Sequence, residues 1–334
     1  MTDSFFAPLQ DDRPIRARLA PSPTGALHLG NARSFLLAWL SARQQGGEIF
    51  LRVEDIDSPR VKPEAVHQTI EDLRWLGLDW DQSDLQKDAE PILQSDRMPR
   101  FLAMLEELVQ AGRLYVCRCS RKDVAEAASA PHDTGLPALE GDIYPGTCRD
   151  ACLKPKLMEK YAWRWNFDDA EVKWKDRLRG LQRANPARQL GDYVIAKFQD
   201  GALVPAYQLA VVVDDNDQGI TEVVRGDDLI FSTYRQLAIL DHFNWTPPNY
   251  IHVPLVVGPD GRRLAKRHGD TRLSFFREAG IRAESIVGYL AHSIGLINQR
   301  VDVTARELIG ELDWSKISTA PTVFELDREF SELS

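Results

Sequence analysis

The segment Arg16–Arg33, RARLAPSPTGALHLGNAR, predicts a strand, a tight turn and the start of a helix. Small and apolar residues precede a turn rich in proline and glycine, and the helical pattern then continues to Leu40. A glycine in the turn lets the backbone approach a ligand, and the helix N-terminus offers unpaired amides to an anion. His28 adds a donor suited to a phosphate. Alternatively, the segment is an ordinary strand-to-helix turn capped by a histidine.

The next segments extend this unit toward a parallel sheet. Gln44–Gly47 ends the helix, and Glu48–Val53 is apolar enough for a buried strand. A strand, a helix and a second strand in this order form a βαβ unit, which begins a doubly wound α/β sheet. Ligands bind beyond the carboxyl ends of such strands, so we expect Pro21–Asn31 and Glu54–Asp57 to border one site.

Apolar periodicity predicts the remaining elements. Helices are expected at residues 63–76, 97–112 and 232–243, with a pair of helices at 275–296. Strands are expected at 209–215, 221–225 and 251–257, the first ending in the carboxylates Asp214 and Asp215. Residues 1–13 are predicted to form a disordered or loosely packed leader, and residues 304–334 carry no signature that we can place.

Composition favours a soluble enzyme but does not suggest a nucleic-acid partner. The chain has 334 residues, 43% hydrophobic and 27% charged, which is ordinary for a globular enzyme of about two domains. It has neither a membrane-length apolar run nor a signal-peptide pattern at its start, so we expect a cytoplasmic protein without a membrane partner. The net charge of −9 disfavours RNA binding in general, although local basic clusters matter more than the total.

The cysteines suggest a metal site. Cys117, Cys119 and Cys148 fall within one segment, and such clustering in a cytosolic chain favours a metal over a disulfide. Zinc takes four donors, usually Cys or His, so His132 and Cys152 are candidates for the fourth on chemistry alone. The alternative is a set of reduced thiols without a metal.

Four segments in order carry a family resemblance. The pattern PSPTGALHLGNAR at Pro21–Arg33 resembles the first signature of class I aminoacyl-tRNA synthetases in its glutamyl/glutaminyl form. Leu51–Asp57, Glu222–Leu229 and Arg263–Gly269 resemble three further motifs of that family. The chain is most similar to the short glutamyl-Q branch, whose members resemble a glutamyl-tRNA synthetase without its anticodon-binding part. The resemblance spans roughly residues 14–297.

The resemblance implies a fold and a division of the chain. We expect an α/β class I synthetase with a Rossmann-like parallel sheet, an inserted acceptor-end or zinc subdomain, and a short helical C-terminal region. The expected parts are a leader at 1–13, the first catalytic half at 14–112, the insertion at 113–201, the second catalytic half at 202–258, and the Lys-Arg loop with the helical region at 259–334. Little chain follows Leu296, so no anticodon-binding domain is expected.

The resemblance also implies the site residues. His28 and Lys266 would be catalytic, and ATP with Mg²⁺ would be bound by His28, Gly30, Asn31 and Lys266. L-glutamate would be bound by Arg18, Ala20, Ser22, Glu54, Tyr207 and Arg225. An arginine fork matches a carboxylate, an acid suits the ammonium group, and a mobile lysine suits the leaving pyrophosphate. The family loop commonly has Ser before this lysine, whereas this chain has Ala265.

Each of these assignments has a structural alternative. Arg18 or Arg225 would otherwise pair with Asp55 or Asp57. Tyr207 would be a core residue, and the segment around Lys266 a basic surface loop.

By resemblance, one structural zinc ion would be held by Cys117, Cys119, Tyr144 and Cys148. A phenolate is an unusual ligand, but the charge of the metal favours its ionisation. The spacer Ser120–Ile143 is longer than in compact members, which is consistent with a mobile loop or with a degenerate site.

The implied function is ATP-dependent activation of glutamate and its transfer to the queuosine base in the anticodon of tRNA(Asp), by a monomer. A truncated synthetase that charges tRNA(Glu) and a non-catalytic tRNA- or nucleotide-binding relic are the alternatives. Full-length glutamyl enzymes often have Asn four residues after the pocket tyrosine, where this chain has Val211, as the short enzymes do.

Overall fold

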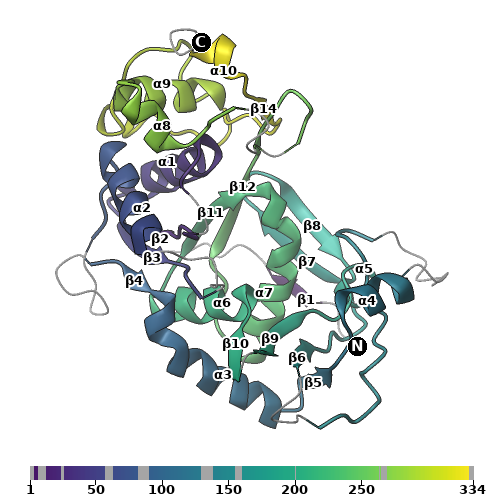
Figure 1. Ribbon diagram of the computed structural model, residues 1–334. Helices are drawn as coiled ribbons and strands as arrows, with labels where there is room; N and C mark the ends of the chain where they lie inside the picture. The colour runs from purple at the N-terminus through teal and green to yellow at the C-terminus, as the bar shows by residue number, and fades with distance from the viewer. Residues whose placement is uncertain are drawn as a thin grey trace.

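The computed structural model describes residues 4–6, 13–23, 26–56, 63–81, 90–128, 138–154, 160–199, 201–262, 264 and 269–330. A parallel sheet lies at its centre (Figure 1). Strands β2 (Arg16–Leu19), β3 (Glu48–Val53) and β4 (Ile92–Leu93) form one parallel ladder, and β11 (Glu222–Gly226) and β12 (Asn249–Val253) form another. The two ladders meet where the Thr221 amide donates to the Arg16 carbonyl at 2.9 Å.

Both faces of this sheet are buried, as a doubly wound fold requires. On β3, Ile49 and Leu51 enter one hydrophobic core while Phe50 enters another. Adjacent residues on β11 divide in the same way, with Val224 in the first core and Val223 in the second. This alternation explains why the strands read as continuous apolar runs.

Helices cover the two faces. The first core contains α1 (Leu29–Arg43), α2 (Pro63–Trp75), α8 (Leu273–Glu278) and α9 (Ala283–Ser293). The second contains α3 (Met98–Gln110), α6 (Tyr207–Asp217) and α7 (Ile230–His242). None of the described helices is long and apolar enough to cross a membrane. The predicted βαβ unit of β2, α1 and β3 is confirmed.

An antiparallel sheet in the lower part of Figure 1 and a mixed sheet at the right complete the molecule. One has the order β10-β9-β6-β5 and comprises Ala202–Pro205, Val194–Gln199, Tyr161–Trp165 and Leu114–Cys117. The other has the order β1-β7-β8 and comprises Ser4–Phe6, Val172–Asp176 and Gly180–Ala184. Short helices α4 (Arg121–Ala128) and α5 (Pro186–Gln189) connect these strands.

Three sequence-based expectations are wrong. The predicted strand 209–215 is helix α6, because a short run of buried apolar residues does not distinguish a buried strand from a buried helix. The predicted leader contributes β1, which pairs in parallel with β7. The predicted strand 251–257 is divided by Pro254 into β12 and the short β13 (Val256–Val257). In addition, part of the spacer after Cys119 is helical, as α4.

The C-terminal segment belongs to the first core. Strand β14 (Thr322–Val323) pairs in parallel with β13, and α10 (Leu326–Glu329) follows it. The buried side chain of Arg33 in α1 donates to the Thr322 hydroxyl at 2.6 Å and to the Pro254 carbonyl at 2.5 Å. The segment without a recognised signature is therefore tied to the helix that begins at the predicted site.

Candidate active site

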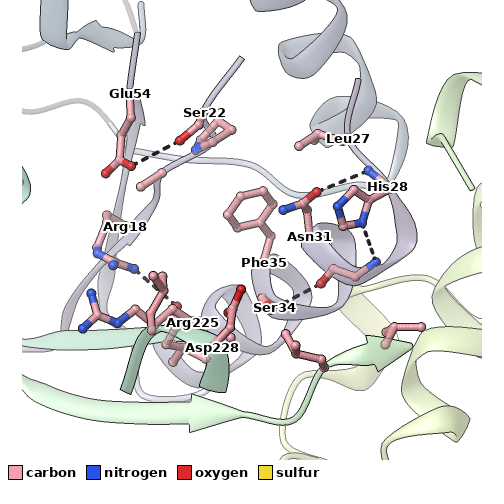
Figure 2. A pocket seen from close by; sticks show the side chains of 18 of the residues that line it. Arg18, Ser22, Leu27, His28, Asn31, Ser34, Phe35, Glu54, Arg225 and Asp228 are labelled. Atoms are coloured by element: carbon pink, nitrogen blue, oxygen red, sulfur yellow. Dashed lines mark hydrogen bonds between the residues drawn. The ribbon is translucent and has the colours of Figure 1, made fainter. Parts of the chain in front are cut away.

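The carboxyl ends of β2, β3, β11 and β12 border a pocket of about 470 Å³ (Figure 2). Nine predicted site residues line it: Arg18, Ala20, Ser22, His28, Gly30, Asn31, Glu54, Tyr207 and Arg225. Lys266 and Ala265 lie outside the described residues. The topology accounts for this gathering, since parallel strands deliver their carboxyl ends to one edge of the sheet.

One end of the pocket is the N-terminus of α1. His28 is the N-cap residue, and its Nδ1 accepts the Gly30 amide at 3.2 Å. In a neutral ring the proton then lies on Nε2, which is a donor. Asn31 completes a capping box through its Oδ1, 3.5 Å from the His28 amide. His28 is thus both a cap and a pocket residue, so the two interpretations of this segment are compatible.

The described flank of the Lys-Arg loop is bound to this same helix end. The Leu29 amide donates to the Thr271 carbonyl at 3.1 Å, and the Leu273 amide donates to the Leu27 carbonyl at 2.8 Å. On the other side of the loop, Val256 lines the pocket.

The other end of the pocket carries charged side chains, with Arg18, Ser22, Glu54 and Arg225 on the side away from His28 in Figure 2. Arg52 holds Glu54 through Nη2 and Oε1 at 3.2 Å, and the Ser22 hydroxyl donates to Glu54 Oε2 at 3.5 Å. Burial raises the pKa of Glu54, opposed by the positive charges of Arg52 and Arg18. A cation bound beside Glu54 would therefore stabilise its ionised form.

Asp215 links the two buried arginines behind Glu54. It lies 2.7 Å from Arg52 Nη1 and 3.6 Å from Arg18 Nε. Burial lowers the pKa of Arg18, and the positive charges of Arg52 and Arg225 lower it further. The negative charge of Asp215 partly opposes this shift. The pocket therefore concentrates positive charge close to an acid, which suits a zwitterion with an additional carboxylate.

Arg225 is held by neutral groups. Its Nη2 donates to Thr233 Oγ1 and to Gln236 Oε1, each at 2.8 Å, its Nε to His252 Nε2 at 3.0 Å, and its Nη1 to the Tyr207 hydroxyl at 3.4 Å. Among the described residues, no carboxylate forms a salt bridge with Arg225, so its charge can be met by a ligand.

The alternative in which Arg18 or Arg225 pairs with Asp55 is therefore wrong. Asp55 accepts from the amide and hydroxyl of Ser95 at 2.8 and 2.6 Å, Arg18 pairs with Asp215, and Asp57 lies outside the described residues.

Sequence reasoning missed several residues around the site. Asp228 lines the pocket. Arg52 and Asp215 do not line it, but Arg52 binds both Asp215 and the pocket residue Glu54. An arginine within an apolar strand was the available signal for Arg52, because such a charge needs a buried partner. The partner was not recognisable, since residues 209–215 were interpreted as a strand.

The predicted metal ligands form a separate cluster that begins with Cys117, the last residue of β5. The sulfurs of Cys117, Cys119 and Cys148 all lie within 4.8 Å of one another. The Tyr144 hydroxyl is 3.4 Å from the Cys117 sulfur and 3.7 Å from the Cys119 sulfur, and the Cys119 and Cys148 sulfurs are 3.5 Å apart. Cys152 is exposed and outside this group, and His132 lies outside the described residues.

These distances suit a tetrahedral ion. Metal–sulfur and metal–oxygen bonds of about 2.3 and 2.0 Å place tetrahedral donors about 3.5–3.8 Å apart. Burial and the neighbouring cysteines raise the pKa of Tyr144, while burial raises the pKa of Cys119 to about 11. The cluster can hold a metal ion, whose charge would offset the cost of ionising several adjacent donors.

Arg164 packs against Tyr144, and Asp192 binds two side chains near the cluster. The Arg164 guanidinium lies 3.8 Å from the centre of the Tyr144 ring. Asp192, which is buried, accepts from Arg149 at 2.7 Å and from the Tyr115 hydroxyl at 2.6 Å. Of the four donor residues, Tyr144 is thus held directly, by Arg164, while Asp192 fixes the neighbouring Arg149 and Tyr115.

Comparison with known proteins identifies related chains. The model of the family described as "tRNA synthetases class I (E and Q), catalytic domain" matches residues 14–328, about thirty residues beyond the extent of the expected resemblance. A glutamyl-Q tRNA(Asp) synthetase of Rhodopirellula baltica is 47% identical, over 92% of this chain and 96% of the relative. Another, of Nitratidesulfovibrio vulgaris, is 43% identical, over 94% and 96% of the two chains.

Longer proteins are also similar. A glutamate–tRNA ligase of Coxiella burnetii is 38% identical over 94% of this chain, which matches only 64% of the ligase. The crystal structure of a glutamate tRNA ligase from Elizabethkingia meningosepticum, in complex with its amino acid, superposes with a TM-score of 0.77 at 26% identity, covering 95% of this chain and 68% of that one.

Proposed function

Because the chain belongs to the class I tRNA synthetases of the E and Q type, we propose that it activates L-glutamate with ATP and transfers the glutamyl group to the queuosine base in the anticodon of tRNA(Asp). The names of its relatives at 43–47% identity support this acceptor. The single observation that carries the activation step is the pocket, which joins a helix N-terminus to Glu54 and to Arg225, whose guanidinium forms no salt bridge within the described residues.

The charged end of the pocket is proposed to bind glutamate. Arg225 meets the side-chain carboxylate, because its own hydrogen-bond partners are neutral. Glu54 meets the ammonium group, since it is held in place by Arg52 and the incoming cation favours its ionised form. Arg18, Ala20, Ser22 and Tyr207 form the remaining walls.

The helix end is proposed to bind ATP. Gly30 and Asn31 border the space for the nucleotide, and His28 directs its Nε2 proton toward a phosphate oxygen. Lys266 is proposed to neutralise the leaving pyrophosphate, and the described flanks of its loop reach the pocket and the start of α1. Mg²⁺ bound with ATP supplies additional neutralisation of phosphate charge.

The reaction then proceeds in two substitutions. A glutamate carboxylate oxygen attacks the α-phosphorus of ATP, forming a P–O bond while pyrophosphate leaves. A nucleophile of the queuosine base next attacks the activated carbonyl carbon, loses its proton, and releases AMP. The protein contributes orientation and charge neutralisation, which are the main needs of a reaction between two anions.

We also propose that Cys117, Cys119, Tyr144 and Cys148 hold one structural zinc ion. The spacing of their donor atoms and the choice of thiolate ligands support zinc over harder cations. The expected division at residues 112, 201 and 258, and the monomeric state, are likewise proposals.

ATP–pyrophosphate exchange tests the activation step without any tRNA. We expect exchange that depends on glutamate and is not supported by glutamine or aspartate at the same concentration. Absence of exchange, with and without added tRNA, would favour the non-catalytic relic.

A further inference from the structure

A buried polar chain runs from Asp176 through His252 to Arg225. Asp176 ends β7 and His252 lies on β12, and both side chains are fully buried. The Nδ1 of His252 is 2.7 Å from Asp176 Oδ2, and its Nε2 is 3.0 Å from Arg225 Nε. Neither Asp176 nor His252 lines the pocket.

The hydrogen bonds determine the tautomer of His252. Asp176 accepts the backbone amides of Leu178, Arg179 and His252 at 2.9, 2.7 and 3.1 Å, which fixes its carboxylate. An ionised carboxylate only accepts, so Nδ1 of His252 must carry the proton. The lone pair on Nε2 then faces the Nε–H of Arg225, which only donates.

His252 is kept neutral by its surroundings. Burial lowers the pKa of His252 to about 4, and the positive charges of Arg225 and Arg18 also lower it. Asp176 raises the pKa but does not offset these effects. Within the described residues, Trp174, Tyr250 and the Thr233 hydroxyl also contact the ring. At neutral pH the ring is therefore a rigid, uncharged acceptor.

Neutral acceptors bind all but one of the N–H donors of Arg225 within the described residues. A guanidinium has five N–H donors, and four have acceptors in His252, Tyr207, Thr233 and Gln236. The remaining N–H is on Nη1, the nitrogen that contacts the pocket residue Tyr207. A carboxylate in place of His252 would have neutralised the guanidinium, whereas an imidazole orients it and leaves its charge.

We propose that His252, oriented by Asp176, is a positioning residue that holds Arg225 with one edge facing the side-chain carboxylate of glutamate. The inference rests on the proposed function and deepens it, because it assigns selection of an acidic over an amide side chain to the fixed orientation of a charged guanidinium. A site built around an oriented group of this kind discriminates strongly against an isostere that cannot pair with it.

Two substitutions at one position separate the two hydrogen bonds of the ring. His252→Asn retains a donor near the position of Nδ1, for Asp176, and removes the acceptor for Arg225. His252→Gln instead places an amide oxygen near the position of Nε2 and loses the bond to Asp176. His242→Asn is the matched control, because His242 is at the end of α7, contacts Trp165 and does not line the pocket.

The measurements are KM for glutamate, KM for ATP, kcat of exchange, and the ratio of kcat/KM for glutamate to that for glutamine. For His252→Asn we expect KM for glutamate to rise about 30-fold and the ratio to fall about tenfold, with KM for ATP unchanged. For His252→Gln we expect a change below about fivefold. If His252→Asn does not fold, His252→Gln still tests the proposal, because it keeps an acceptor for Arg225 and loses only the hydrogen bond to Asp176. A fall of the ratio by about tenfold in His252→Gln would then overturn the proposal.

Equal losses in both variants, or an unchanged ratio in His252→Asn, would overturn the positioning role. Absence of glutamate-dependent exchange in the unsubstituted protein would instead contradict the proposed function.

Discussion

The imidazole of His28 folds back over Gly30, with its Nδ1 3.2 Å from the Gly30 amide nitrogen. A Cβ atom at residue 30 would lie 3.1 Å from Cε1 and 3.2 Å from Nδ1 of this ring. These contacts are tighter than ordinary van der Waals separations, so the ring must move when residue 30 gains a side chain. The close approach explains why a glycine follows the helix cap at this position.

Gly30→Ala is therefore expected to raise KM for ATP about tenfold, because it displaces His28, while the melting temperature stays nearly constant. Exchange kinetics at varied ATP measure the effect. A double-mutant cycle supplies the control: in a His28→Ala background, Gly30→Ala should cost almost nothing. Additive losses would show that residue 30 acts independently of the ring.

Lys266→Ala is expected to lower kcat of exchange at least about 100-fold, because the leaving pyrophosphate loses a positive partner. The affinity for glutamate, measured by titration calorimetry without ATP, should not change. The restoring substitution Ala265→Ser, which adds the family hydroxyl, is expected to lower KM for ATP moderately. Retention of exchange by Lys266→Ala would refute the assigned role.

Arg225→Lys is expected to raise KM for glutamate about 100-fold, because an ammonium group replaces neither the fork geometry nor its four anchoring hydrogen bonds. KM for ATP should remain within about twofold. An equal rise in both constants would indicate a general disturbance of the pocket.

Metal analysis of the purified protein is expected to give one zinc ion per chain. Cys119→Ser should lose the metal and melt at a lower temperature, because structural zinc contributes to folding. Cys152→Ser is the matched control, since Cys152 is exposed and lies outside the sulfur cluster. A metal content unaffected by Cys119→Ser would remove this residue from the ligand set.

Asp72 gives a prediction with a defined pH dependence. Burial raises its pKa to about 6, and its Oδ2 has no hydrogen-bond partner among the described residues. A carboxyl whose pKa is raised in the folded state favours folding at low pH, and this contribution is lost as pH rises through 6. Asp72→Asn should therefore raise the melting temperature at pH 7.5 and have little effect at pH 4.

At Asp79 the substitution to Asn is expected to change the melting temperature at pH 7.5 in the opposite direction. Its pKa is lowered because Arg43, Trp39 and Arg306 together outweigh the effect of partial burial. Asp79→Asn should lower the melting temperature at pH 7.5 and have less effect at pH 4. Shifts of the same sign in both variants would contradict the electrostatic account.

Local patterns in the sequence predicted the part of the fold that forms the site. The strand, turn and helix at residues 16–43 follow from apolar periodicity and from glycine and proline positions, which act over a few residues. The same reasoning placed β3 at its observed bounds. Nine proposed ligands of ATP and glutamate lie in one pocket because the family motifs follow the carboxyl ends of the strands.

Contacts between distant segments could not be predicted in this way. Helix α6 was mistaken for a strand because it is buried between α3, α7 and the sheet and has almost no polar face. Because α6 is a helix, Asp214 and Asp215 both reach Arg52, whereas consecutive side chains of a strand would point to opposite faces. Asp214 also pairs with Arg97, and Asp215 with Arg18. The pairing of Ser4–Phe6 with β7 likewise joins segments that no local pattern connects.

The acceptor of the glutamyl group tests the central claim most directly. Labelled glutamate and ATP are incubated with queuosine-containing tRNA(Asp) that lacks its 3′-terminal adenosine, with the same tRNA without queuosine, and with intact tRNA(Glu). We predict that label enters the queuosine-containing tRNA(Asp) despite the missing 3′ end, and enters neither of the others. Label on intact tRNA(Glu) alone would contradict the account and make the protein a charging synthetase.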